Sequence, residues 1–199
     1  MEYLLSGALG LALAACSGFR VFVPLLAASI AYYTGMLHPS PGFAWLGSWV
    51  AVGALGTATV MEILGYYFPF VDNILDTITT PASFIAGTVL MTAALPDLDP
   101  VVRWGLGVLV GGGTAGIIQT GTTLLRAGST MGTAGLGNPV LATAENTLAV
   151  LGTVLALLLP LLAAGLGLVL VLYIATRLRR WRQRRRGRNP ASVVPLAQH

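Results

Sequence analysis

The stretch Ser17-Gly18-Phe19-Arg20-Val21-Phe22-Val23-Pro24 interrupts an apolar segment that runs from residue 3 to residue 35. As one straight helix, this segment would be about 50 Å long, whereas the hydrocarbon core of a bilayer is roughly 30 Å thick. Gly18 loosens the helix and Pro24 cannot donate a backbone hydrogen bond, so we place the break here. The sequence therefore predicts a broken helix or a re-entrant hairpin, with Arg20 at the break.

The composition is that of a polytopic membrane protein. Of the 199 residues, 55% are hydrophobic and only 9% are charged, and the mean hydropathy is +0.80. A soluble domain carries about 25% charged residues, so a soluble fold is excluded. The length suits one helical transmembrane domain, which we assign to residues 1–176.

Positive charge is concentrated at the C-terminal end of the chain. The net charge is +4, but eight of the eleven basic residues are the arginines at 177, 179, 180, 182, 184, 185, 186 and 188. We expect residues 177–199 to form a basic, disordered tail on the cytoplasmic side, as the positive-inside rule requires. This tail would attract anionic lipid headgroups. Nucleic acid is not an expected partner, because the run begins at the bilayer and Trp181 is its only aromatic residue.

The other apolar segments predict an all-α fold with about five to six membrane segments. They cover residues 43–67, 81–95, 101–125 and 139–176, and we expect Pro160 to kink the last one. The count is five if the first segment crosses once and six if it crosses twice. Aromatic residues at 45 and 49, and at 66–68, are expected at the two membrane interfaces.

Two steps of a polar residue followed by proline predict helix starts. Residues 71–79 have the spacing of a short amphipathic helix, with Asp72 and Asp76 on one face. Thr80-Pro81 is then expected to open the next helix, and Asn138-Pro139 the last one. Such N-termini attract anions, although ordinary capping of a helix is the alternative.

Six charged residues lie in or beside the apolar segments: Arg20, Glu62, Asp72, Asp76, Arg126 and Glu145. A charge in hydrocarbon costs about 2.5–3.5 kcal/mol on insertion scales, so we expect most of them to face a protein interior or a wet cavity. Arg126 is the exception, because its place near a helix end favours the headgroups. Asp72 and Asp76 would hold a cation or share a proton, unless they form the wet face of an interfacial helix. Glu62 either belongs to the site or extends to the headgroups.

The candidate ion-binding or ligand-binding residues are Asp72, Asp76, Glu145, Arg20, Glu62, Asn73, Asn138 and Asn146. We expect the acids to bind a cation or a proton, with Arg20 as their counter-charge or as a contact for an anion. No catalytic residue and no cofactor are predicted. The histidines are His38 and His199 and the cysteine is Cys16, so neither residue type supplies a metal site, and the sequence lacks nucleophile-elbow and phosphate-loop motifs.

An ordered set of motifs resembles the bacterial multi-pass family known as domain of unknown function 4126. The motifs are Ser17-Gly18-Phe19-Arg20-Val21-Phe22-Val23-Pro24-Leu25-Leu26, Glu62 before Pro69, Asp72 to Asp76, and Gly137-Asn138-Pro139-Val140-Leu141-Ala142-Thr143-Ala144-Glu145-Asn146. The family pattern has Asp-Lys before the proline at 69, Arg before Pro81 and Glu-Asp at 145–146, whereas this chain has Tyr66-Tyr67, Thr80 and Glu145-Asn146. The resemblance implies a multi-pass protein of the bacterial inner membrane and no assigned activity.

Two functions remain open at this stage. One is a small transporter or channel with a polar intramembrane site for an ion or small solute, which the charged residues on separate segments favour. The other is a non-transporting scaffold or lipid-interacting protein, which the G-x-x-x-G pairs at 107–111 and 112–116 and the Arg tail favour. The expected partners are the bilayer, anionic lipid headgroups and, as an open option, a second copy in a homo-oligomer.

Overall fold

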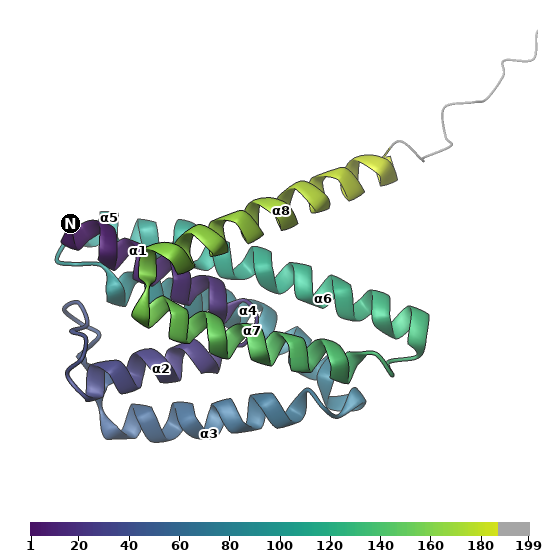
Figure 1. Cartoon of the computed structure of the whole chain (residues 1–199), viewed down its shortest axis with the longest axis horizontal. Coiled ribbons are helices and arrows are strands. Elements are labelled where there is room, and N and C mark those ends of the chain that lie inside the picture. The colour runs from purple at the N-terminus through teal and green to yellow at the C-terminus, as the bar shows by residue number, and fades with distance from the viewer. Residues whose placement is uncertain (187–199) are drawn as a thin grey trace, which may run out of the picture.

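The computed structural model describes residues 1–186, apart from the side chains of residues 69, 70, 72, 73, 182 and 184–186. Helices make up the secondary structure of this part of the chain (Figure 1). In chain order they are α1 (Glu2–Ser17), α2 (Phe22–Tyr33), the 3-10 helix η1 (Ala44–Gly47), α3 (Trp49–Gly65), α4 (Pro69–Ala94), α5 (Pro100–Leu106), the π-helix η2 (Gly107–Gly112), α6 (Gly113–Thr133), α7 (Asn138–Leu158) and α8 (Pro160–Arg186). The all-α prediction is confirmed.

Four helical segments are long and apolar enough to cross a membrane. They are Ile74–Ala94, Pro100–Thr133, Asn138–Leu158 and Pro160–Trp181. Three further apolar helices are shorter, namely α1, α2 and α3. The coarse prediction of helices suited to a membrane is therefore confirmed.

The predicted break in the first apolar segment is confirmed. α1 ends at Ser17 and α2 begins at Phe22, and the two helices run back toward the same end of the molecule (Figure 1). At 1.5 Å per residue, α1 is about 24 Å long and α2 about 18 Å, so each is shorter than the hydrocarbon core. Pro24 lies in the first turn of α2, where a missing N–H costs no helical hydrogen bond.

The expected helix start at Thr80-Pro81 is wrong, because α4 continues from Pro69 to Ala94 with Pro81 inside it. The predicted amphipathic helix is therefore the first part of α4. Two hydroxyl groups bind carbonyls beside the proline: Thr80 donates to the Asp76 carbonyl at 2.7 Å, and Ser83 donates to the Thr80 carbonyl at 2.9 Å. Local hydrogen bonds of this kind allow proline inside a membrane helix.

The last apolar segment forms two helices and not one kinked span. α7 starts at Asn138 as expected, although its N-cap is Gly137 and no side chain caps it. It ends at Leu158, and α8 then leads back past α1 and α6 toward the other end of the molecule (Figure 1). α8 stays helical through Arg186, past the expected end of the membrane domain at 176, and residues 187–199 lie outside the described part.

The core lies around α1, whose central residues Ala12, Leu13 and Ala14 are at most 1% exposed. α4 packs against η2 through glycine, as the G-x-x-x-G spacing allows. A methyl group on Gly87 would lie 2.6 Å from the Gly111 carbonyl oxygen, so only glycine fits there. These glycines are therefore used for packing within the chain.

Candidate functional site: a buried network of charges

A turn of close-packed residues places Arg20 inside the protein. The N–H groups of Phe19 and Arg20 both donate to the Cys16 carbonyl, at 3.0 and 3.2 Å, and so end α1. A methyl group on Gly18 would lie 2.6 Å from Ile118 Cβ and 2.7 Å from the Ala115 carbonyl oxygen, both in α6. Glycine is thus required where the hairpin tip touches α6.

Glu62, from the last turn of α3, caps the start of α2. Its carboxylate accepts the Val21 N–H at 2.7 Å and the Phe22 N–H at 3.0 Å. These are two of the N–H groups that a helix start leaves unpaired, and a negative charge is favoured there. Glu62 is 3% exposed. Extension to the headgroups is therefore excluded, and the carboxylate holds the second arm of the hairpin in place.

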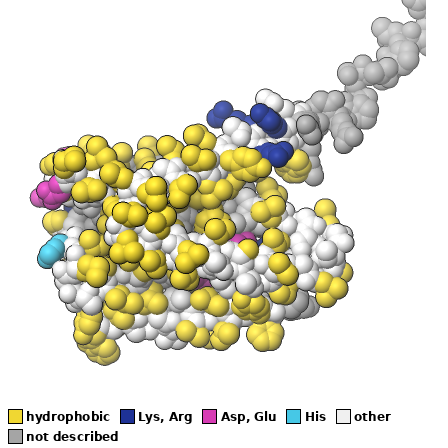
Figure 2. Space-filling view, viewed as in Figure 1, with side chains coloured by type: hydrophobic (Ala, Val, Ile, Leu, Met, Phe, Trp, Pro, Cys, Tyr) yellow, Lys and Arg dark blue, Asp and Glu magenta, His cyan; other side chains and the backbone are white. Residues whose placement is uncertain are grey.

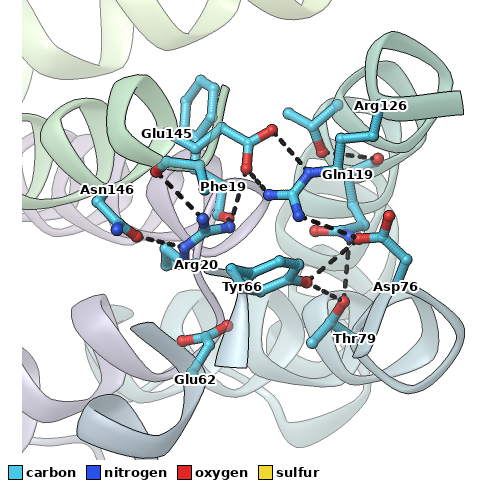
Figure 3. Close-up of polar contacts among 12 residues, drawn as sticks. Phe19, Arg20, Glu62, Tyr66, Asp76, Thr79, Gln119, Arg126, Glu145 and Asn146 are labelled. Carbon is cyan, nitrogen blue, oxygen red and sulfur yellow. Dashed lines mark hydrogen bonds and ion pairs between the residues drawn. The ribbon is translucent and has the colours of Figure 1, made fainter. Parts of the chain in front are cut away.

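Arg20 binds fixed partners through all three nitrogens of its guanidinium group. Its Nη1 donates to Glu145 at 2.9 Å and to the Phe19 carbonyl at 3.0 Å. Its Nε donates to Asn146 Oδ1 at 2.5 Å, and its Nη2 to the Ala142 carbonyl at 3.2 Å. The partners on α7 fix both the position and the orientation of the charge at the hairpin tip (Figure 3).

Arg126, from α6, binds the same carboxylate from the other side. Its Nε donates to Glu145 Oε1 at 3.2 Å, and its Nη2 contacts Glu145 Oε2. Its Nη1 lies 3.8 Å from Asp76 Oδ1 on α4. The Arg126 side chain is 3% exposed, so the expectation that it faces the headgroups is wrong. A two-point pair of this kind is the strong form of an arginine–carboxylate contact.

Tyr66 lies between the two arginines. The guanidinium carbon of each arginine is 3.9 Å from the centre of the Tyr66 ring. The hydroxyl group donates to Asp76 at 3.2 Å and shares a 2.9 Å hydrogen bond with Thr79, to which Gln119 also donates at 3.2 Å. At 2% exposure Tyr66 is not an interface residue, which corrects that expectation. Its ring lets two like charges approach one another, because each meets an aromatic face.

We define the central polar network by these side chains: Arg20, Glu62, Tyr66, Asp76, Thr79, Gln119, Arg126, Glu145 and Asn146 (Figure 3). Asp76 and Glu145 each lie seven residues after the start of their helix, and Arg126 lies seven residues before the end of α6. All three charges are therefore about 10 Å from one end of the helix bundle. Two arginines face three acids, so the described network has one excess negative charge if all are ionised.

Most of the sequence-predicted residues meet in this network. Arg20, Asp76, Glu145 and Asn146 are joined by direct contacts, and Glu62 lies beside them (Figure 3). Asn138 is elsewhere, at the start of α7, where its amide donates to the Thr130 hydroxyl at 3.1 Å. The side chains of Asp72 and Asn73 lie outside the described residues.

Sequence reasoning missed four members of the network: Tyr66, Thr79, Gln119 and Arg126. Gln119 had a usable signal, since it is an amide in an otherwise apolar part of its segment. Tyr66 lies four residues after Glu62 and so shares a helix face with it. Among the described side chains, no group of three or more His, Cys, Asp or Glu residues is placed to hold a metal ion.

The fold and this network define a class: an all-helical protein with membrane-length apolar helices around a buried cluster of paired charges. The chain belongs to the family described as domain of unknown function DUF4126, whose model matches residues 8–180. The resemblance seen in the sequence is thereby confirmed. No curated protein and no solved structure matches the chain.

Proposed function

We propose that this protein is a small transporter or channel of the bacterial inner membrane, and that its central polar network is a site for a small anion. One observation carries the proposal: the Glu145 carboxylate accepts hydrogen bonds from both Arg20 and Arg126. Two guanidinium groups directed at one carboxylate are the donor set that binds anions in proteins. The protein's own carboxylate fills that position here.

The topology that we propose has five crossings, formed by α3, α4, the continuous α5–η2–α6 segment, α7 and α8. α1 and α2 form a re-entrant hairpin, because they run back to the same end of the molecule and α2 has only 12 residues (Figure 1). Figure 2 supports the orientation, because arginine side chains gather near the C-terminal end of α8, whereas acidic ones are visible at the opposite end and in hollows near the middle. The positive-inside rule then places the C-terminus and the network end on the cytoplasmic side. Non-helical backbone inside a membrane protein is tolerated where it is enclosed by protein, and transporters use helix breaks of this kind at their sites.

Anion binding would require Glu145 to give up its place. A proton on Glu145 removes its negative charge, and an incoming anion restores that charge between the same two arginines. The charge of the network is then the same before and after the exchange, so a proton and an anion would be bound together. Asp76 remains beside Arg126, and Tyr66 keeps the two guanidinium groups in place. The sequence led us to expect that the acids bind a proton, and we assign that role mainly to Glu145.

The network also extends to the surface through hydrogen bonds at its α7 side. Asn146 donates to the Tyr67 hydroxyl at 3.4 Å, and this hydroxyl shares a 3.2 Å hydrogen bond with Thr143. Tyr67 is 41% exposed. A polar path therefore leads from Arg20 through Asn146 to an exposed hydroxyl, which is the route that we assign to solute entry from the cytoplasmic side.

A structural role for the network is the second candidate. Its charges bind one another, and Glu62 caps α2, so the same contacts would fix the helices in a scaffold that moves no solute. Buried ion pairs can set the register of helices in this way. The two candidates differ in whether Glu145 can be replaced by a free anion.

Chemical rescue of Glu145→Ala tests the anion site. The variant leaves two buried guanidinium groups without their carboxylate, which costs about 3–5 kcal/mol. We expect its thermal midpoint in detergent to fall, and to recover in acetate but not in gluconate at equal ionic strength, because only the smaller carboxylate fits the space. Glu2→Ala, at an exposed position, is the matched control and should show neither effect. Equal midpoints in acetate and gluconate would contradict the anion site.

Flux in proteoliposomes tests transport. We expect the wild-type protein to raise acetate or chloride entry above that of empty vesicles, with faster flux at lower external pH. Glu145→Gln mimics the protonated acid, so its flux should lose the pH dependence, while Glu2→Gln should behave as the wild type does. If neither the wild type nor Glu145→Gln moves either anion, transport is contradicted and the structural role stands.

A further inference from the structure

A large apolar groove lies between α8 and the helices α1, α6 and α7. Its volume is about 1290 Å³, which exceeds the 300–1,000 Å³ typical of small-molecule pockets. Figure 1 shows how it arises, since α8 diverges from α7 toward its C-terminal end. Apolar and small residues line most of it, among them Ala15, Gly128, Leu151, Gly152, Gly167 and Leu170. An occupant made of hydrocarbon would fit this lining.

One end of the same groove is cationic. Arg177, Arg180 and Trp181 line it there. Arg177 Nε donates to the Tyr173 hydroxyl at 3.2 Å, and its guanidinium carbon lies 5.5 Å from the centre of that ring. Within residues 1–186, no described carboxylate forms a salt bridge with Arg177 or Arg180. The charge of this end is therefore available to an anion from outside the chain.

The distance between the two kinds of lining fits a lipid. From Ala163 to Arg177, α8 rises about 21 Å, whereas half of the hydrocarbon core is about 15 Å. An acyl chain can therefore lie along the apolar part while its phosphate reaches the arginines. Tryptophan at the same level is typical of the interface between hydrocarbon and headgroups.

We propose that the groove between α8 and α1, α6 and α7 binds one anionic diacyl phospholipid, with its acyl chains along the glycine-lined wall and its phosphate at Arg177 and Arg180. The site is separate from the anion site of the central network, and it stands whether or not that site transports. α8 contacts the rest of the chain along only part of its length. A lipid bound in the groove would hold α8 against the helix bundle.

A second copy of the chain is a less suitable occupant. Two copies side by side in one membrane share their orientation, so the α8 helix of one would bring its own arginines to the arginines of the other. Like charges at such a contact are destabilising. A helix in the groove would also offer no anion to Arg177 and Arg180, whereas a phospholipid supplies both the hydrocarbon and the charge.

Native mass spectrometry of the full chain in detergent tests the proposal, with phosphatidylglycerol as the probe and phosphatidylcholine of the same chain length as the neutral lipid. We expect phosphatidylglycerol to be retained in preference to phosphatidylcholine, at one lipid per chain. Arg177→Gln and Arg180→Gln should each weaken its binding by about fivefold. Arg179→Gln is the matched control on the same helix, because Arg179 does not line the groove, and it should change little.

Gly128→Phe tests the hydrocarbon part without touching any charge. Nothing lies within 4 Å of a methyl group at Gly128, so the ring would fill the groove while the helix is kept, because Gly is the weaker helix former. We expect phosphatidylglycerol binding to be lost, and to be kept in Gly53→Phe, whose position is equally open but outside the groove.

Equal retention of the two lipids, or equal binding of glycerol phosphate without chains, would overturn the proposal. A lipid-free dimer would overturn it too, as would an equal loss in Arg177→Gln and Arg179→Gln, which indicates unspecific attraction. Each variant's thermal midpoint is measured alongside, so that a misfolded variant is recognised. Unchanged lipid binding in a folded Gly128→Phe would likewise contradict the groove as the site.

Discussion

Arg20 and Arg126 lie within the helix bundle, whereas Arg177, Arg179 and Arg180 lie on an exposed helix end. The first pair is at most 3% exposed and binds Glu145 from two sides. The second group has no carboxylate partner within the described residues. Arginine thus binds a carboxylate of the protein in the first region, whereas in the second region it is available to an anion from outside the chain.

The difference lies in where the acids are. Glu62, Asp76 and Glu145 come from α3, α4 and α7 and meet at the tip of the α1–α2 hairpin. The exposed arginines follow one another on α8, where helix geometry spreads them around the axis and no acid is near. Pairing across helices produces a fixed site, whereas clustering along one helix produces a charged surface. Substitutions in the two regions should therefore differ in their main effect, stability in one and lipid association in the other.

Arg126→Met should have the largest effect on stability. It removes one partner of a buried charge network and leaves Glu145 and Asp76 without that cation, which costs about 3–5 kcal/mol. Unfolding in detergent, followed by circular dichroism, measures this. The paired variant Arg126→Met with Glu145→Met should lose less than the sum of the two single changes, because the unpaired charge is removed as well. Additive losses would show that the pair is not coupled.

Glu62→Gln should have an intermediate effect. Its amide can accept only one of the two N–H groups at the start of α2, and its own N–H group would face the other. The loss of one charged hydrogen bond and the misplaced donor together cost about 1–3 kcal/mol. The same unfolding assay checks it, with Glu2→Gln as an exposed control that should change little. A loss no greater than that of the control would mean that α2 does not depend on this cap.

Arg177→Gln should have the smallest effect, below about 0.5 kcal/mol in lipid-free detergent, because an exposed charge without a carboxylate partner among the described residues adds little to stability. Added phosphatidylglycerol should raise the thermal midpoint of the wild type more than that of the variant, since only the wild type keeps both arginines of the groove. A large loss of stability in lipid-free detergent would mean that Arg177 supports the fold as Arg20 and Arg126 do, and the contrast between the two regions would then be wrong.

The sequence predicted the parts of the fold that depend on local chemistry. The break at Ser17-Gly18-Phe19-Arg20 and the start of α7 at Asn138 follow from glycine, proline and a charge in an apolar segment. Pro81 has the same local appearance as Pro139, but α4 passes through it because neighbouring hydroxyl groups bind the carbonyls beside it. Whether Pro160 kinks a helix or separates two antiparallel ones depends on what α8 packs against, which no local pattern contains.

The sequence predicted several residues of the site, but it did not predict which of them pair with one another. Intramembrane charge selected Arg20, Glu62, Asp76 and Glu145, because such charge is costly unless it is enclosed. The same reasoning failed for Arg126, since a residue one or two turns from a helix end can face lipid headgroups or protein, and only packing decides. Tyr66 was missed for a related reason. A tyrosine near the end of an apolar helix is typical of a membrane interface, and the sequence does not show that two guanidinium groups enclose its ring.

The hairpin tip also has a consequence for how the chain is made. Glu145 leaves the ribosome 125 positions after Arg20. At ordinary rates of synthesis the delay is on the order of ten seconds. During that time the first hairpin carries a charge whose protein partner does not yet exist, so it should remain at the membrane surface or beside an insertion factor until α7 arrives. Assembly of the described helices would then proceed from the later ones inward, with α1 and α2 the last to take their final place.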